Sequence, residues 1–254
     1  MVFPIYDDNT GRRTTPFVNY LFIAINLFVF IVLQAGGTNE RFTYAYSTVP
    51  YEIVNNEDVD RPVAVDVPGT RERVRIEHAD VPFSVYLTLL TSMFMHGGWM
   101  HLLGNMLFLW IFGDNIEDDL GHARYVVFYL LCGVLASLAH VLTNTSGINA
   151  LIPSLGASGA ISGVLGAYLV LHPRRRVTVI LLRILTEVPG WVAVGLWFVF
   201  QLINGLGLLG GGSQESGIAY AAHIGGFLVG LVLVKLFAIG RGRGGDGDRF
   251  APAY

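Results

Sequence analysis

The chain has 254 residues, of which 53% are hydrophobic and 14% are charged. An ordinary globular domain carries about 25% charged residues, so this composition excludes a typical soluble domain. The net charge of −3 gives no reason to expect nucleic acid as a partner. The single cysteine, Cys132, excludes a disulfide framework and a cysteine-based metal site.

The scarce charges leave five long stretches without any Asp, Glu, Lys or Arg. These stretches are residues 14–39, 81–113, 125–173, 188–214 and 216–234. A helix that crosses roughly 30 Å of hydrocarbon needs about 20 apolar residues, and the third stretch is long enough for two such helices. The sequence therefore predicts an all-α, polytopic membrane protein embedded in a lipid bilayer.

Six transmembrane helices are expected, over residues 17–34, 99–115, 124–142, 155–171, 191–209 and 217–238. The first has a signal peptide as its alternative, because Arg12 and Arg13 precede it. It is longer than a usual signal core and lacks a small-x-small cleavage site. The 125–173 stretch divides at the small polar residues 143–147, which favour a turn between two helices.

A long connection joins the first two helices, and we expect it outside the membrane. Within its first part, 35–80, apolar and polar residues alternate over 63–76 around Pro68 and Gly69. This alternation predicts a small β-hairpin in water. The remaining part, 81–98, is apolar but too interrupted to cross the membrane. We therefore expect it to form an interfacial or re-entrant segment that dips into the bilayer.

Two further segments flank the last helices. Residues 177–187 form an amphipathic piece that carries Arg183 and is expected on the cytoplasmic membrane surface. Residues 239–254 are rich in Gly and Arg, which is typical of a flexible tail. The chain thus divides into a cytoplasmic N-terminal segment, 1–16, a six-helix membrane domain, 17–238, and this cytoplasmic tail.

Positive charges predict the orientation of the six helices. Arginine and lysine cluster at 12–13, at 174–176 and at 235–243, whereas the short connections 143–153 and 210–216 contain none. Cytoplasmic loops carry an excess of Lys and Arg, and all three clusters fall on one side if there are six spans. We therefore expect both termini in the cytoplasm.

Polar side chains inside spans are costly and mark functional candidates. His101 and Asn105 lie one turn apart at the start of the second helix, Ser158 begins the fourth, and His223 lies in the sixth. Under the predicted orientation all four lie towards the outer side of the membrane. Three separate helices therefore deliver a serine, a histidine and a His/Asn pair to one depth.

These residue types fit nucleophilic catalysis. A serine hydroxyl becomes nucleophilic when a neutral histidine takes its proton, and the resulting oxyanion needs hydrogen-bond donors. The side chains of His101 and Asn105 and the backbone N–H of Ser158 are suitable donors. Asp114, the only acid in a predicted span, lies near the cytoplasmic end, so a Ser158–His223 dyad is the simplest reading.

Small residues explain how the fourth and sixth helices could approach. Gly159 and Gly163 lie on one stripe of the fourth helix, and Gly226 and Gly230 lie on one stripe of the sixth. Small residues four positions apart let membrane helices pack closely.

Structural readings of the polar residues stay open beside the catalytic one. A lone serine in a membrane helix usually bonds its own backbone, and His101 with Asn105 could merely join two helices. Among the other histidines, we expect His140 to bond a neighbouring helix and His96 to anchor the 81–98 segment.

In combination, these motifs resemble the rhomboid family of intramembrane serine proteases, over about Leu87 to Leu236. The resemblance rests on the segments 96–105, 156–159 and 222–226. It implies a six-helix core with a loop that dips into the membrane before the second helix. It also implies that Ser158 is the nucleophile, His223 the general base, His101 and Asn105 the oxyanion hole, and Gly226 a close-packing residue.

Two features depart from the family pattern. Many members carry an aromatic residue one turn after the nucleophile, stacked on the catalytic imidazole, where this chain has Ser162. A Trp-Arg pair common in the dipping loop is replaced by Leu87 and Thr88. The first departure requires another group to orient His223.

The resemblance implies hydrolysis of peptide bonds in or beside transmembrane segments of other proteins, without a metal or cofactor. Water must reach the dyad through a polar cavity, and the substrate must unwind there, which favours small or helix-breaking residues. Lateral access past the fifth helix is a further hypothesis, with aromatic membrane-belt residues as its alternative. Its wall would be formed by Trp191, Trp197, Phe198 and Phe200.

Other functions fit the sequence less well. A zinc protease needs a His-Glu-x-x-His helix, and an aspartyl protease needs two intramembrane aspartates; the sequence has neither. A transporter would show repeated halves and ion ligands in its spans. The main alternative is a non-catalytic rhomboid-like protein that binds membrane clients. The compact core, with no targeting peptide, favours a prokaryotic cell membrane. Substrate identity and oligomeric state stay open.

Overall fold

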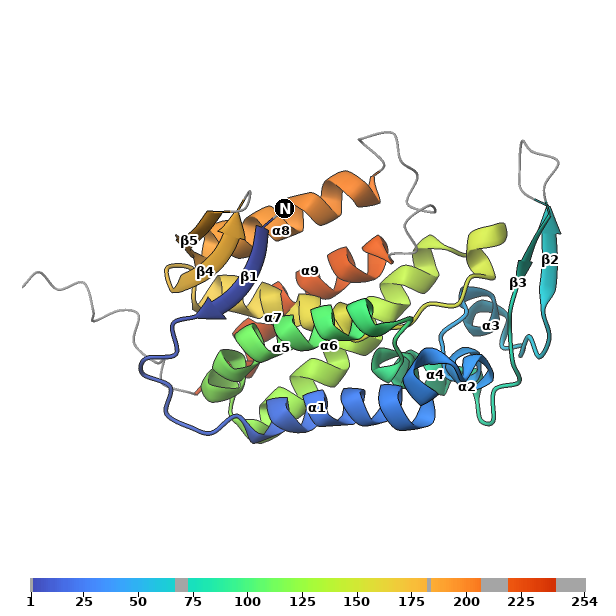
Figure 1. The fold of residues 1–254 in the computed structure, drawn as a ribbon, viewed down its shortest axis with the longest axis horizontal. Coiled ribbons are helices and arrows are strands. Elements are labelled where there is room, and N and C mark those ends of the chain that lie inside the picture. The colour runs from blue at the N-terminus through green and yellow to red at the C-terminus, as the bar shows by residue number, and fades with distance from the viewer. Residues whose placement is uncertain (1, 67–72, 182–183, 207–218, 241–254) are drawn as a thin grey trace, which may run out of the picture.

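The computed structural model describes residues 2–66, 73–181, 184–206 and 219–240. The fold is mainly helical, and each of the six predicted ranges contains a helix (Figure 1). These are α1 (Phe17–Phe28), α5 (Trp99–Leu120), α6 (His122–Thr143), α7 (Ser158–Leu171), α8 (Gly190–Gly205) and α9 (Tyr220–Phe237). α1 continues as a π-helical turn, Val29–Leu33.

The six helices differ in how well they match a bilayer. Within the described residues, α6 and α9 are long and apolar enough to cross one, with mean hydropathies of 2.1 and 1.8. α7, α8 and α1 with its π-helical extension are apolar but shorter. α5 has 22 residues, and its last turns carry the acidic side chains of Asp114 and Glu117 to Asp119.

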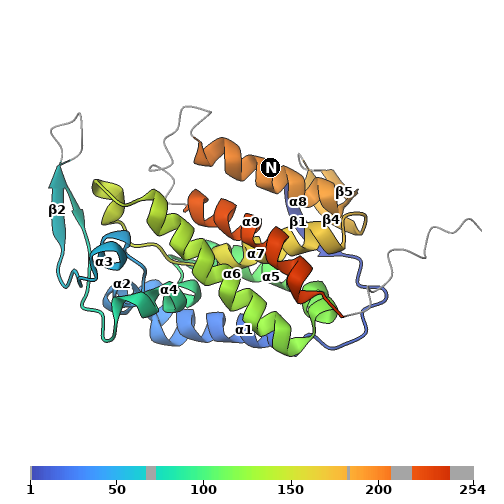
Figure 2. The ribbon, with the colours of Figure 1, turned by 180° about the vertical axis from the view of Figure 1, so that it is seen from behind.

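The central helix of the bundle is α7, which packs against α5, α6 and α9 (Figure 2). Every residue from Gly159 to Tyr168 is buried. A helix that is apolar all round must be enclosed by its neighbours, and the many Gly and Ala residues of α7 let those neighbours come close. The nucleophile candidate Ser158 therefore stands at the start of the most enclosed helix.

A three-stranded antiparallel sheet lies at one end of the bundle, beside the start of α8 (Figure 1). Its strands, in spatial order, are β1 (Val2–Asp7), β4 (Arg176–Leu181) and β5 (Ile184–Pro189). The amphipathic segment 177–187 is thus part of a β-hairpin, and the all-α prediction was wrong for this part of the chain. Val177 and Val179 are fully buried on one face, which is the period-two pattern of a strand. Arg183 lies outside the described residues.

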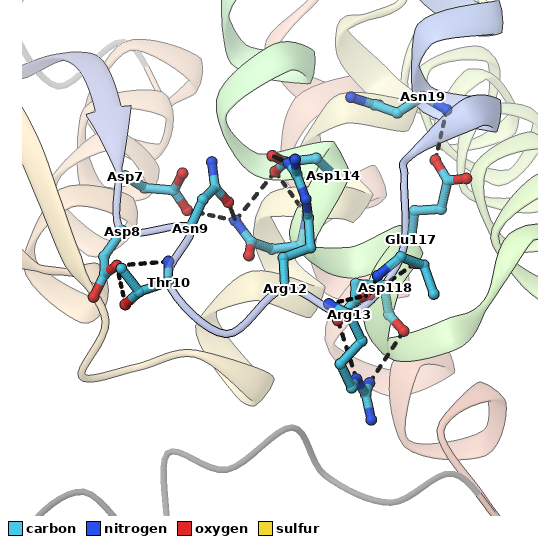
Figure 3. A network of polar contacts seen from close by, with 12 residues as sticks. Asp7, Asp8, Asn9, Thr10, Arg12, Arg13, Asn19, Asp114, Glu117 and Asp118 are labelled. Carbon is cyan, nitrogen blue, oxygen red and sulfur yellow. Dashed lines mark hydrogen bonds and ion pairs between the residues drawn. The ribbon is translucent and has the colours of Figure 1, made fainter.

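The N-terminal segment is held against α5 by a polar network (Figure 3). Arg12 Nη1 donates to Asp114 Oδ2 at 2.7 Å, and Asn115 Nδ2 donates to Asp7 Oδ2 at 2.7 Å. The segment 1–16 is therefore an integral part of the fold. Asp114 serves in this network and not as a third member beside the Ser–His pair.

The connection between α1 and α5 forms a separate layer at the opposite end from the three-stranded sheet (Figure 1). Its elements are α2 (Glu40–Ala45), α3 (Pro50–Asn55), β2 (Val63–Asp66), β3 (Arg73–Ile76) and α4 (Thr88–Thr91). β2 and β3 pair antiparallel, with Val63 opposite Ile76, where the hairpin was expected. Pro68 and Gly69 lie outside the described residues, as does the expected tail beyond Gly240.

The 81–98 segment folds into short helical turns that are tied to the end of α1. The side chain of Gln34 is buried and spans this junction. Its Nε2 donates to the carbonyl oxygen of His96 at 2.9 Å, and its Oε1 accepts from the backbone N–H of His96 at 3.0 Å. The anchor is the backbone of His96 and not its side chain. Within the described residues neither ring nitrogen has a hydrogen-bond partner, and the ring packs against Phe30 and His101.

Candidate active site

Ser158 and His223 meet between the starts of α7 and α9. His223 Nε2 lies 2.7 Å from Ser158 Oγ, although 65 residues separate the two in the sequence. Both residues are half-buried. This is the geometry in which an imidazole can remove a proton from a serine hydroxyl.

The two helices can approach because their contact surfaces lack side chains. A Cβ atom on Gly226 would overlap the carbonyl oxygen of Gly159, and one on Gly230 would overlap the carbonyl oxygen of Gly163. Gly226 and Gly230 of α9 face the backbone of α7, but the glycines of α7 do not all face α9 in return. The missing side chain of Gly163 faces Cys132 of α6, so α7 is packed tightly on two sides.

His101 reaches the same place from the start of α5. The backbone N–H of Gly97 donates to His101 Nδ1 at 3.3 Å, which leaves the proton of a neutral ring on Nε2. Nε2 faces Gly156, where an added Cβ would lie 2.8 Å from Nε2 and 3.7 Å from Ser158 Oγ. Gly156 has a φ of +125°, a conformation that favours glycine. The ring therefore presents an N–H donor beside the serine.

Asn105 lies one turn beyond His101 on α5 and is 7% exposed. Within the described residues its Nδ2 group has no hydrogen-bond partner. Buried amide donors in folded proteins are almost always paired, so an unpaired one needs an explanation. A substrate oxygen would supply the missing acceptor.

Gln201 of α8 is a site residue that the sequence analysis missed. Its Oε1 lies 2.8 Å from His223 Nδ1, on the opposite side of the imidazole from Ser158. Gln201 is 6% exposed. The other side-chain amide of α8, that of Asn204, donates to the carbonyl oxygen of Phe200. The available signal was a polar side chain inside the predicted span 191–209.

Position 162, where many family members carry an aromatic residue, is a serine that makes a different contact. The hydroxyl of Ser162 donates to the carbonyl oxygen of Ser158 at 2.6 Å, so it does not orient His223. Aromatic neighbours of the imidazole come instead from Trp197 and Tyr220, whose ring centroids lie 6.2 Å and 6.4 Å away.

The hydrogen bond expected from His140 to another helix is not what the structure shows. The ring contact of His140 is with Asn144 Nδ2, at 3.4 Å, immediately after the end of the same helix. Its partner is local because His140 lies in the last turn of α6, where the chain turns back.

The aromatic residues of α8 divide into two groups. Trp197 and Phe198 pack inward, with ring centroids 6.2 Å and 4.1 Å from that of Phe227 in α9. Trp191 and Phe200 are exposed, at 57% and 39%. Of these four residues, only Trp197 and Phe198 lie at the contact between α8 and its neighbours, where a movable wall would have to be.

The motif residues all lie within the part of the chain that a known family model matches. The family model described as a Rhomboid domain matches residues 84–239. The chain belongs to the rhomboid family. The rhomboid domain thus begins in the 81–98 segment and ends just after α9, and this family is membrane-embedded.

Several curated relatives are similar to this rhomboid chain. Rhomboid protease GluP of Bacillus subtilis is 30% identical over 238 residues, which are 89% of this chain and 40% of GluP. The mitochondrial Rhomboid protein 1 of Saccharomyces cerevisiae is 32% identical over 147 residues, which are 58% of this chain and 40% of the relative. The chain thus spans about two fifths of the length of these relatives.

A third relative extends the comparison to animals. The mitochondrial Presenilin-associated rhomboid-like protein of Mus musculus is 33% identical over 147 residues. These residues are 56% of this chain and 36% of the mouse protein. Rhomboid proteins similar to this one therefore occur in bacteria and in mitochondria.

Proposed function

We propose that this rhomboid protein is a serine endopeptidase that cuts peptide bonds in or beside transmembrane segments of other membrane proteins. The observation that carries the proposal is the 2.7 Å contact between Ser158 Oγ and His223 Nε2. The similarity to Rhomboid protease GluP supports the same reaction class.

In the proposed reaction, His223 Nε2 takes the proton of the Ser158 hydroxyl while Oγ attacks the carbonyl carbon of the scissile bond. The tetrahedral intermediate collapses when the imidazolium gives its proton to the leaving amine, and the C–N bond breaks. Water then attacks the acyl-enzyme with His223 again as the base, which releases the new carboxyl terminus and restores Ser158.

We propose that three donors stabilise the oxyanion of the intermediate. The Nε2–H group of His101 and the unpaired Nδ2 group of Asn105 come from α5, and the backbone N–H of Ser158 lies at the free N-terminus of α7. Donors held in advance around a developing negative charge lower the barrier without having to reorganise.

We propose a topology of six spans with both termini in the cytoplasm of a cell-membrane protein. The arginine clusters and the six helices support it. The Ser158–His223 pair then lies towards the outer face, where its partial exposure supports a water-filled opening. The three-stranded sheet and the N-terminal network then lie on the cytoplasmic side.

The proposed substrates are transmembrane proteins with small or helix-breaking residues near their outer membrane edge. An intact helix uses its carbonyl groups in its own hydrogen bonds, so the scissile bond must first unwind. We propose that substrates reach the dyad laterally past α8. The packing of Trp197 against Phe108 of α5 and Phe227 of α9, at the edge of α8, supports this path.

Labelling of the serine tests this function directly. The detergent-solubilised protein is treated with a fluorophosphonate, and intact mass is measured for the parent, Ser158→Ala and His223→Ala. We expect one adduct on the parent and none on either variant. Ser162→Ala is the matched control and should label like the parent, because the Ser162 hydroxyl bonds only its own helix.

The contrary outcome is equally informative. A folded parent protein that takes up no fluorophosphonate, while an active rhomboid protease labels in parallel, would reject the protease. The chain would then be a non-catalytic rhomboid protein that binds membrane clients.

A further inference from the structure

The imidazole of His223 is held from two sides. Ser158 Oγ lies 2.7 Å from Nε2, and Gln201 Oε1 lies 2.8 Å from Nδ1. The second contact joins α8 to α9 across 22 residues of sequence. The proposed reaction steps do not include this contact between Gln201 and His223.

A histidine that acts as a general base needs a partner on its other nitrogen. A neutral imidazole carries one proton, and Nε2 can accept the serine proton only if that proton sits on Nδ1. A buried Nδ1–H group in turn requires an acceptor. In serine proteases with a triad, a carboxylate supplies this acceptor and fixes the tautomer.

Neither an acid nor the family's aromatic residue is available for this role. α7, α8 and α9 contain no Asp or Glu, and Asp114 of α5 is bound to Arg12. The Ser162 hydroxyl donates to the carbonyl oxygen of Ser158. The Gln201 side-chain carbonyl is the acceptor that the described contacts place at Nδ1.

We propose that Gln201 is the positioning residue of the catalytic base: its side-chain carbonyl holds the proton of His223 on Nδ1 and leaves Nε2 free for Ser158. This inference rests on the proposed protease function. A neutral amide suits the site because a carboxylate buried between membrane helices carries a large desolvation cost, whereas an amide oxygen accepts the same bond without a charge.

The position of Gln201 also connects α8 to catalysis. Trp197 lies one turn earlier on the same face of α8, and its ring centroid is 6.2 Å from that of His223. One face of α8 therefore supplies both a hydrogen-bond acceptor and an aromatic neighbour for the base. A movement of α8 away from α9 would withdraw both at once.

The opposite orientation of the amide has different chemistry and can be distinguished. The side-chain NH₂ group of Gln201 could instead donate to Nδ1 of His223. The proton of the neutral imidazole would then sit on Nε2 of His223, and this nitrogen could not accept the proton of the Ser158 hydroxyl. A carboxylate at position 201 can only accept. Gln201→Glu therefore keeps an acceptor for the Nδ1 proton of His223. Gln201→Met removes the acceptor and leaves a side chain of similar size.

The experiment measures kcat and KM for cleavage of a transmembrane substrate from pH 5 to 9, with thermal unfolding as the check on folding. We expect Gln201→Met to lower kcat roughly ten- to hundredfold with KM nearly unchanged. Gln201→Glu should recover most of kcat at high pH, with the acidic limb of the profile moved to higher pH because a carboxylate stabilises the imidazolium. Asn204→Leu is the matched control, since the Asn204 amide on the same helix donates only to the carbonyl oxygen of Phe200.

Two results would overturn the inference while the protease stands. One is a folded Gln201→Met protein with the parental kcat and pH profile. The other is a folded Gln201→Glu protein as impaired as Gln201→Met at every pH. If the parent itself is neither active nor labelled at Ser158, the proposed function fails instead.

A measurement on the unaltered protein covers the case in which the variants do not fold. The ¹⁵N signals of the His223 ring, assigned by their loss in His223→Ala, report which nitrogen carries the proton. Protonated Nδ1 at pH 8 is expected. A proton on Nε2 would refute the positioning role whatever the variants do.

Discussion

Gly230 of α9 lies directly against the carbonyl oxygen of Gly163 in α7, so the two helices meet backbone to backbone. Gly226 and Gly159 repeat this contact one turn nearer to the dyad. The 2.7 Å contact of Ser158 with His223 depends on this approach, because any intervening side chain would separate the two helix starts.

Gly230→Ala is therefore expected to destabilise the protein and to disrupt the site. A Cβ at this position has to displace backbone, and overpacking of this kind costs about 1–3 kcal/mol. Thermal unfolding in detergent and fluorophosphonate labelling measure the two effects. Gly195→Ala on α8 is the control, since an added Cβ there meets no atom within 4 Å. A parental melting temperature for Gly230→Ala would contradict the close contact.

Asn105→Ala tests the oxyanion hole. Loss of one donor to the oxyanion lowers kcat by roughly 10²–10³ in serine proteases, with little change in KM. We expect an effect of this size, because the Asn105 Nδ2 group is buried and has no partner within the described residues. Steady-state cleavage of a transmembrane substrate measures it. Asn144→Ala, at the end of α6, is the control, and an equal loss in both variants would argue for a general structural effect.

Trp197→Ala tests lateral access past α8. The ring packs against Phe108 of α5 and Phe227 of α9, so its loss should loosen this wall and raise the cleavage rate of a transmembrane substrate severalfold. Labelling of Ser158 by a small fluorophosphonate, which needs no lateral entry of a substrate helix, should not rise with the cleavage rate. Trp191→Ala, which removes a side chain that is 57% exposed, is the control. An unchanged cleavage rate in Trp197→Ala would count against the gate.

The contribution of Asp7 to stability should fall as pH rises from about 4 to 7. Burial and the nearby charge of Asp114 raise the pKa of Asp7 to about 7, well above the usual value for an aspartate. The folded state then binds a proton that the unfolded state has lost, so this contribution is complete below the unfolded pKa and disappears as pH rises through 7. Asp7→Asn should flatten the pH dependence of the melting temperature and stabilise the protein at pH 8.

Glu52 contributes with the same sign and limits what Asp7→Asn can do alone. Burial raises the pKa of this carboxyl in α3 to about 7. The single variant should therefore reduce the slope, and Asp7→Asn with Glu52→Gln should reduce it further. Asp60→Asn, at an exposed position, should leave the slope unchanged. A slope equal to that of the parent in the double variant would contradict the raised pKa values of both carboxyls.

The positions of the six helices and the types of the motif residues followed from the sequence because both are local properties. The length of an uncharged run can be compared with the thickness of a membrane without knowing the fold. A serine or histidine inside such a run can likewise be recognised before its contacts are known. The predicted meeting of Ser158, His223, His101 and Asn105 used only this depth and the chain order of the helices.

The tertiary structure alone decided which groups serve these residues. Gln201 is an ordinary amide in an apolar stretch until α8 packs against α9, and Gly97 sets the tautomer of His101 only once the 81–98 segment is folded. The N-terminal strand β1 pairs with β4, and Arg12, which follows that strand, reaches Asp114 across 102 residues. Such contacts depend on how distant elements pack, and no period or composition in the sequence records that arrangement.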